Sequence, residues 1–314
     1  MLLPLAVWGL WSCPLAADEP SSSAAIAKTT AQLMEVAFPA SRLIDATGAR
    51  LIDTDASPSA EGAGVSSDDS FELVTPLGRI DQSNSRVVLI TERAPADSAG
   101  LVQAAHPDQA EIGVYFFTKQ LQGWKLESGT DDVLEAGFFG AVNGIDVSRI
   151  SADADAVAIH FGSCWQGYCG SWLSVIGLVD RHAEVWGKYI RLSANDVAAK
   201  EACDVPLTNE TSGHSNSSAS ATTTDGIPHW PSGKTDIPVD QCFNVTGHYR
   251  FSGTASKDAS HASDLTLSFT GAVASVGNGV LRRDARYAVN ATAIYRLTDG
   301  QYRLSAGVNP VPQF

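Results

Sequence analysis

Residues 156–179, AVAIHFGSCWQGYCGSWLSVIGLV, predict the central β-hairpin of the fold. In the first arm Val157, Ile159 and Phe161 alternate with smaller or more polar residues, which is the period of a β-strand. The second arm, residues 172–179, is apolar on both faces, so we expect it to lie in the interior of a sheet. The glycine-rich tip between the arms indicates a turn.

The tip is also a candidate recognition loop, formed by Trp165, Tyr168 and Trp172. Trp and Tyr are frequent anchors of binding interfaces, and a covalently tightened loop loses less entropy when it binds. The ligand would be an unknown protein or a glycan. The alternative interpretation is that the rings fold back over the edge of the sheet and contribute only by burial.

Four cysteines beyond the first residues predict two disulfides. Cys164 and Cys169 flank the hairpin tip, which favours a local bridge and leaves Cys203 with Cys242, although the sequence alone permits three connectivities. Both bridges are interpreted as structural. The alternative is a thiol-disulfide oxidoreductase that uses Cys164 and Cys169. Four residues separate these cysteines, however, whereas thioredoxin-type enzymes have two.

Charge and motifs exclude several classes of function. The 314 residues carry a formal charge of −14, which argues against nucleic acid as a partner. The chain has no phosphate-binding loop, no dinucleotide-binding glycine motif and no His-Glu-x-x-His sequence. The seven histidines are dispersed, so we expect neither a metal site nor a cofactor. A hydrolase whose Ser-His-Asp triad assembles from distant positions stays open as an alternative.

The first residues predict export. Residues 1–17 are uncharged and apolar and end in Leu15-Ala16-Ala17, as a secretory signal peptide does. A minority interpretation is a lipid anchor at Cys13, which follows a sequence similar to a lipobox. No later run reaches the ~20 apolar residues of a transmembrane helix, so we expect no transmembrane segment. The predicted location is periplasmic or secreted, with the bacterial envelope favoured.

The rest of the chain predicts a mostly β protein. Short strand-like segments are separated by Gly, Pro and Asp clusters, which is typical of antiparallel sheets, either β-sandwich-like or two packed β-lobes. One or two short peripheral helices are expected, at residues 24–38 and 196–202. The predicted organisation is a signal peptide (1–17), a mainly antiparallel β domain (18–203), a Ser/Thr-rich linker or disordered loop (204–241) and a four-stranded antiparallel subdomain (242–314).

One register can be predicted in detail. Asp299-Gly300 is a strong signal for a two-residue hairpin turn. Such a turn places Leu297 opposite Tyr302 and Tyr295 opposite Leu304, so that apolar residues face each other on one side of the sheet.

Taken together, these features favour an exported, disulfide-stabilised β protein that acts by binding or as a structural component of the envelope. Whether the chain is an enzyme stays open, and the absence of a catalytic signature favours a non-catalytic role. The competing class is an extracytoplasmic enzyme, either the oxidoreductase or the unrecognised hydrolase described above.

Overall fold

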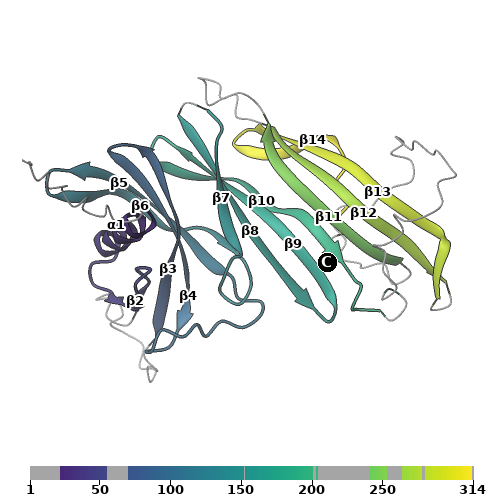
Figure 1. The fold of residues 1–314 in the computed structure, drawn as a ribbon, viewed down its shortest axis with the longest axis horizontal. Coiled ribbons are helices and arrows are strands. Elements are labelled where there is room, and N and C mark those ends of the chain that lie inside the picture. Colours follow the sequence, from purple (N-terminus) through teal and green to yellow (C-terminus); the bar gives the residue numbers. More distant parts are fainter. Residues whose placement is uncertain are drawn as a thin grey trace, which may run out of the picture.

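A computed structural model describes residues 22–54, 70–151, 153–200, 203, 241–252, 264–277 and 280–312. The predictions for residues 1–17 and 204–240 lie outside the described residues. The fold class is confirmed, because the described chain forms two antiparallel sheets of six and eight strands and one helix. Figure 1 shows the smaller sheet with the helix at the left, and the last four strands in green and yellow at the right.

The central hairpin is confirmed. Strands β8 (Ala154–Trp165) and β9 (Tyr168–Val179) pair with Cys164 opposite Cys169 and Trp165 opposite Tyr168. The turn residues Gln166 and Gly167 both have positive φ, at 50° and 84°, which matches the twist of a two-residue hairpin turn. Strand β9 lies between β8 and β10 in the interior of the eight-stranded sheet, as its two apolar faces predict.

Every strand of the eight-stranded sheet pairs with its neighbour in sequence. The predicted register after Asp299-Gly300 is confirmed, since Leu297 faces Tyr302 and Tyr295 faces Leu304. The four strands expected in the C-terminal part are also confirmed. Besides β8 and β9, the sheet contains β7 (Gly144–Arg149), β10 (His182–Asn195), β11 (Gln241–Ser252), β12 (Asp264–Gly277), β13 (Val280–Thr298) and β14 (Gln301–Gly307).

Strand β10 pairs directly with β11, so strands from both sides of residues 204–240 share one sheet. Ser193 faces Thr246, and Asn195 faces Asn244. The disulfide between Cys203 and Cys242 links the chain covalently across the same junction. The division into domains at 204–241 stays a prediction, but the C-terminal strands extend the sheet of the preceding strands.

The six-stranded sheet is also built from sequence neighbours. Its strands are longer than the sequence pattern indicated, because register shifts such as the one between Pro76 and Gly78 interrupt the alternation of apolar residues. The sheet contains β1 (Arg42–Leu43), β2 (Arg50–Asp53), β3 (Phe71–Ser83), β4 (Arg86–Ala96), β5 (Ala110–Gln120) and β6 (Gly123–Ala136).

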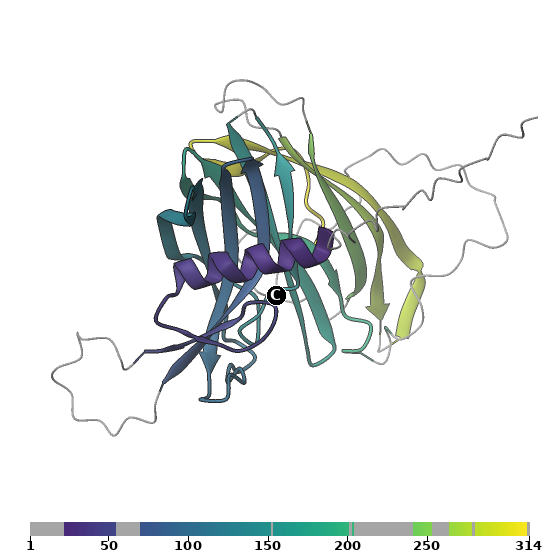
Figure 2. The same ribbon diagram turned by 60° about the vertical axis from the view of Figure 1, so that its left-hand side comes forward.

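The smaller sheet buries both of its faces. One face packs against β8 and β9, where Val88, Ile112 and Leu134 meet Ile159 and Ile176. Helix α1 (Ser22–Ala37) crosses the opposite face, as Figure 2 shows. The helix contributes the fully buried Leu33 and Met34 to a second cluster, so the layers are helix, small sheet and large sheet.

The larger sheet curls so that its other face encloses a third core. Alanines of β8, including Ala156 and Ala158, share this core with Phe243 of β11 and Phe269 of β12. The curl also brings side chains of distant strands together. His160 Nε2 of β8 lies 2.8 Å from the Tyr249 hydroxyl of β11, and that hydroxyl donates a hydrogen bond to Asp146 of β7 at 2.8 Å.

This contact predicts a pH-dependent contribution to stability. The Tyr249 hydroxyl and, to a smaller extent, His160 hold the pKa of Asp146 below its ordinary value of 3.8. A carboxyl whose pKa is lower in the folded state stabilises the fold above its unfolded pKa, and this stabilisation is lost as the pH falls through the folded pKa. Since Asp146 is largely exposed, we expect Tyr249→Phe to lower the free energy of unfolding by only about 1 kcal/mol at pH 7.

Urea unfolding of wild type and Tyr249→Phe at pH 7 and at pH 3 measures this effect. The difference between the two proteins should shrink as the pH falls below the ordinary carboxyl pKa of 3.8 towards the lower pKa of Asp146 in the folded protein. An equal difference at both pH values would contradict a contribution from the Asp146 carboxylate.

The helix expected at residues 196–202 is wrong for the described part of that range. Residues 197–199 form a turn in which Ala199 donates its N–H to the carbonyl of Asp196. The carboxylate of Asp196 accepts the N–H of Phe243 at 2.8 Å, so it bonds to strand β11. This contact with a distant strand outweighs the local preference for a helix.

In the described residues no helix is long and apolar enough to cross a membrane.

Candidate binding site

Three connecting segments meet at one end of the two sheets. They are the β4–β5 loop (residues 97–109), the β6–β7 loop (residues 137–143) and the tip of the β8–β9 hairpin. His106 of the first loop lies between the other two segments. Its ring is 4.9 Å from the ring of Phe139 and 4.8 Å from that of Trp165. Loops held at one end of a rigid β scaffold are common positions for binding residues.

Trp165 presents its ring to solvent. The side chain is 60% exposed, although one part of the ring packs against His106. The neighbouring Cys164 is bonded to Cys169, which fixes the two ends of the tip. Ser163 lies within hydrogen-bonding distance of His106 Nε2, at 2.6 Å, and joins the tip to the β4–β5 loop a second time.

Phe139 is the second exposed aromatic residue at this end. It has a φ of +53°, which is uncommon for a bulky residue, and its side chain is 54% exposed. Gly137 and Gly140 on either side also have positive φ, so the loop turns sharply and directs Phe139 outwards. Such strained backbone is frequent at binding sites. The adjacent Phe138 packs inwards against the core between the sheets.

Two exposed aliphatic side chains also belong to the β4–β5 loop. Val102 is 44% exposed and Leu101 is 66% exposed. Val102 lies next to Gly140, because a Cβ at Gly140 would come within 3.3 Å of Val102 Cγ1. We define the loop patch as these exposed side chains of the β4–β5 loop, the β6–β7 loop and the hairpin tip: Leu101, Val102, Phe139 and Trp165.

The structure separates the three aromatic residues of the candidate recognition loop. Trp165 is exposed, whereas Tyr168 packs against the core of the curled sheet and lies below Lys200 Nζ, at 5.8 Å. Trp172 packs against the core between the sheets and stacks on Phe161, with ring centroids 6.1 Å apart. The burial alternative therefore describes Tyr168 and Trp172, while Trp165 still faces solvent. Participation of these residues in recognition stays a prediction.

Both predicted cysteine pairs are confirmed, Cys164 with Cys169 and Cys203 with Cys242. Cys203 and Cys242 are fully buried together with Ala272 and Ala274. They lie close to Asp196, but cysteines bonded to each other do not supply thiolate ligands for a metal. Cys164 is exposed at the tip, on a hairpin and not at the start of a helix. A redox role for the tip pair stays an alternative.

The Ser163–His106 pair is the nearest approach to a catalytic arrangement at this end. A hydrolase triad would need a third group that orients the imidazole of His106. Among the residues that the structure describes, no carboxylate hydrogen-bonds to His106. The ring is held by aromatic contacts, to Phe138 at 5.4 Å among others. The pair therefore supports a structural role for Ser163.

An acidic pocket lies beside the loop patch. It has a volume of about 380 Å³, and the β4–β5 loop forms one of its walls through Pro107, Asp108 and Gln109. Since His106 precedes these residues, the same loop contacts Trp165 and lines the pocket. The ionisable lining consists of four carboxylates and one guanidinium: Glu72, Asp108, Glu111, Glu135 and Arg93.

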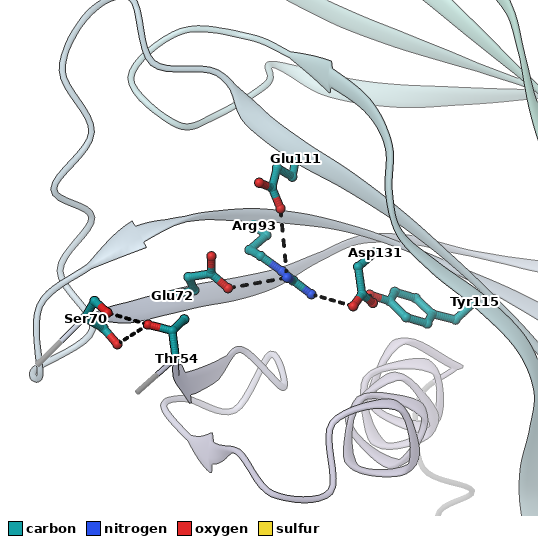
Figure 3. A network of polar contacts seen from close by, with 7 residues as sticks. All are labelled: Thr54, Ser70, Glu72, Arg93, Glu111, Tyr115 and Asp131. Atoms are coloured by element: carbon teal, nitrogen blue, oxygen red, sulfur yellow. Dashed lines mark hydrogen bonds and ion pairs between the residues drawn. The ribbon is translucent and has the colours of Figure 1, made fainter. Parts of the chain in front are cut away.

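Arg93 does not neutralise its surroundings. Figure 3 shows its guanidinium reaching between the carboxylates of Glu72 at 3.4 Å, Glu111 at 3.9 Å and Asp131 at 3.2 Å. Burial raises the pKa of the Glu111 carboxyl, and nearby carboxylates add to the increase although Arg93 opposes it. One cation thus faces three carboxylates, and the excess negative charge favours a positively charged ligand group.

Besides Arg93, the largely buried Tyr115 holds Asp131 in place. The Tyr115 hydroxyl donates a hydrogen bond of 2.6 Å to Asp131, as Figure 3 also shows. Burial and this hydrogen bond raise the pKa of Tyr115 well above its ordinary value. Tyr115 therefore remains a hydrogen-bond donor at physiological pH, and the carboxylate keeps its position beside Arg93.

Sequence reasoning missed His106, Phe139, Val102 and Arg93. Their contacts join loops and strands that are far apart in the chain, which periodicity does not reveal. One local signal was available for Phe139. In Gly137-Phe138-Phe139-Gly140 two large aromatic residues lie between glycines, and only one of them can face the core.

Comparisons of the chain with protein-family models, with curated proteins and with solved structures find no match.

Proposed function

We propose that the protein acts outside the cytoplasm as a non-catalytic binding protein. Its partner would be a protein segment that combines an apolar anchor with a Lys or Arg side chain. The observation that carries this proposal is the loop patch, in which Phe139 and Trp165 are both more than half exposed. The two disulfides support a location in an oxidising compartment.

Exposed apolar side chains of this size favour a protein partner. Large contiguous apolar surfaces on a folded protein usually mark interaction sites, and Trp is enriched among the residues that dominate binding energy. Leu101 and Val102 extend the patch with aliphatic side chains, which fill pockets and pack against apolar partners. A partner that buries Trp165 would remove the largest exposed ring of the patch from water.

The acidic pocket supports a positively charged group on the partner. Its carboxylates exceed its one guanidinium, and its volume is sufficient for a long side chain. A Lys or Arg placed next to an apolar anchor would enter the pocket while the anchor covers Trp165. Such charge complementarity mainly increases the rate of association and weakens with added salt.

The patch is also preorganised. The Cys164–Cys169 bond, the Ser163–His106 contact and the turn around Phe139 each restrict the loops before binding. A restricted surface loses less conformational entropy when the complex forms, so more of the contact energy contributes to affinity.

A photo-cross-linking residue at position 139, introduced in the organism that produces the chain, would identify the partner. The purified partner should then bind wild-type protein, and Trp165→Ala should weaken the affinity about 30-fold or more, as expected for an interface anchor. Glu111→Gln combined with Glu135→Gln should reduce the salt dependence of the association rate. Calorimetry and stopped-flow fluorescence measure the two effects.

Leu304→Ala is the matched control, because Leu304 is a comparably exposed side chain on β14, outside the loop patch. This variant should bind like wild type. If Trp165→Ala and Phe139→Ala both retain full affinity for the cross-linked partner, the loop patch is not the binding surface and the proposal fails.

A further inference from the structure

A second concave surface lies at the opposite end of the six-stranded sheet. It is formed where the β3–β4 turn (residues 84–85) and the β5–β6 turn (residues 121–122) approach helix α1. Strand β4 runs from this end to the loop patch, and its length separates the two surfaces by roughly 30 Å. The cavity here has a volume of about 670 Å³, within the usual range for small-ligand sites.

Four of the ten residues that line this cavity have neutral polar side chains. Thr29 and Gln32 come from α1, and Ser83 and Asn84 come from the β3–β4 hairpin. These groups include hydroxyls and amides, which can donate and accept hydrogen bonds at once. A ligand rich in hydroxyl groups can also donate and accept hydrogen bonds, so it complements the polar wall of the cavity.

Trp124 supplies an apolar wall. It lies at the start of β6, partly buried against the cluster beneath α1. The preceding Gly123, which also lines the cavity, borders open space, because a Cβ at this position would meet no atom within 4 Å. An indole ring offers a flat apolar face, against which the C–H groups on one side of a sugar ring can pack.

An ion pair divides this cavity from a neighbouring one. Arg79 donates hydrogen bonds to Asp81, with Nε 3.0 Å from Oδ1 and Nη2 2.7 Å from Oδ2. Both residues also line a second cavity of about 490 Å³, together with Thr30 and Thr47. The two cavities adjoin at this ion pair and both border α1, and we call them together the α1 groove. A ligand of more than one ring would extend over both.

We propose that this groove binds an oligosaccharide. The larger cavity has two cationic residues and one anionic residue, Arg79 and Lys119 with Asp81, and this small net charge gives little affinity for a highly charged ligand. A wholly apolar ligand is disfavoured because its binding would desolvate the polar wall without new hydrogen bonds. Hydroxyl groups of a saccharide can bond to the fixed Arg79–Asp81 pair while one ring packs on Trp124. The inference is independent of the loop patch and its protein partner.

An array of neutral and uronic-acid oligosaccharides, probed with the purified full chain, tests this site. We expect binding to at least one oligosaccharide. For the best one, calorimetry should show a loss of affinity of at least 10-fold in Asp81→Asn and in Asn84→Ala, both exposed positions where the fold should remain intact. Trp124→Phe should retain more affinity than Trp124→Ala.

Trp165→Ala is the control, and it should bind the oligosaccharide like wild type. Absence of binding across the array would overturn the proposal. Binding that survives Asp81→Asn and Asn84→Ala but is lost in Trp165→Ala would also overturn it, because the sugar would then occupy the loop patch. Thermal unfolding of each variant separates loss of the site from loss of the fold.

Discussion

Trp186→Ala should lower the free energy of unfolding by about 3–5 kcal/mol, as expected when a buried aromatic side chain is truncated. Trp186 is 3% exposed and belongs to the core of the curled sheet. Its ring also meets Tyr302 of β14 edge-on, with centroids 6.4 Å apart. The variant would leave a cavity between β10 and β14, and urea unfolding monitored by circular dichroism measures the loss.

The position of the Trp186 indole depends on a close approach between β9 and β10. A Cβ at Gly177 of β9 would lie 1.9 Å from Cε2 of Trp186, so the indole occupies the space above the glycine. Gly177→Ala should therefore destabilise the wild-type protein by about 1–3 kcal/mol, because the buried ring cannot move away. In the Trp186→Ala background the same methyl group should cost much less.

A double-mutant cycle with Gly177→Ala and Trp186→Ala distinguishes this explanation from a general loss of hydrophobic burial. If the losses in unfolding free energy of the two single variants simply add in the double variant, the packing of the indole does not require a glycine at position 177. Trp186→Phe serves as a control, since it retains an aromatic ring and should cost less than alanine.

Removal of the Cys203–Cys242 disulfide should also have a large effect, about 4 kcal/mol by the loop-entropy relation. The bridge spans 39 residues in sequence, and both cysteines are fully buried. Opening it would free the chain between β10 and β11 in the unfolded state. It would also leave two buried thiols next to Asp196, which supports strand β11 through its bond to Phe243.

Unfolding of the double variant Cys203→Ala/Cys242→Ala measures this contribution. The matched control is Cys164→Ala/Cys169→Ala, whose bridge spans only five residues and should contribute about 2 kcal/mol. A smaller loss in the first variant than in the second would contradict the loop-entropy explanation.

The sequence predicted those parts of the fold in which local signals agree with tertiary packing. The hairpin at residues 156–179 combines alternating apolar residues with a glycine-containing turn. In the hairpin of β13 and β14, the turn at Asp299-Gly300 determines the register through its geometry alone. Strands β1 and β2 were missed because they are short. The turn at residues 197–199 was mistaken for a helix because the Asp196 carboxylate bonds to Phe243, which is distant in sequence.

The candidate site was less predictable than the fold. Trp165 could be singled out from its place at a disulfide-closed tip, but Tyr168 and Trp172 carry the same local signal and pack inwards. Exposure depends on which loop covers which ring. His106 contacts Trp165 across 59 positions of sequence, and no periodic pattern reports such a contact.

The order of the strands has a consequence for folding kinetics. Within each described sheet every strand pairs with a sequence neighbour, so most pairing steps close short loops and resemble independent hairpins. The junction of β10 with β11 differs, because it must close the chain across residues 196–240. Strands β11–β14 should therefore join the sheet in the slowest step. A disulfide between Cys203 and Cys242 that forms before this step would shorten the loop that the pairing of β10 with β11 must close.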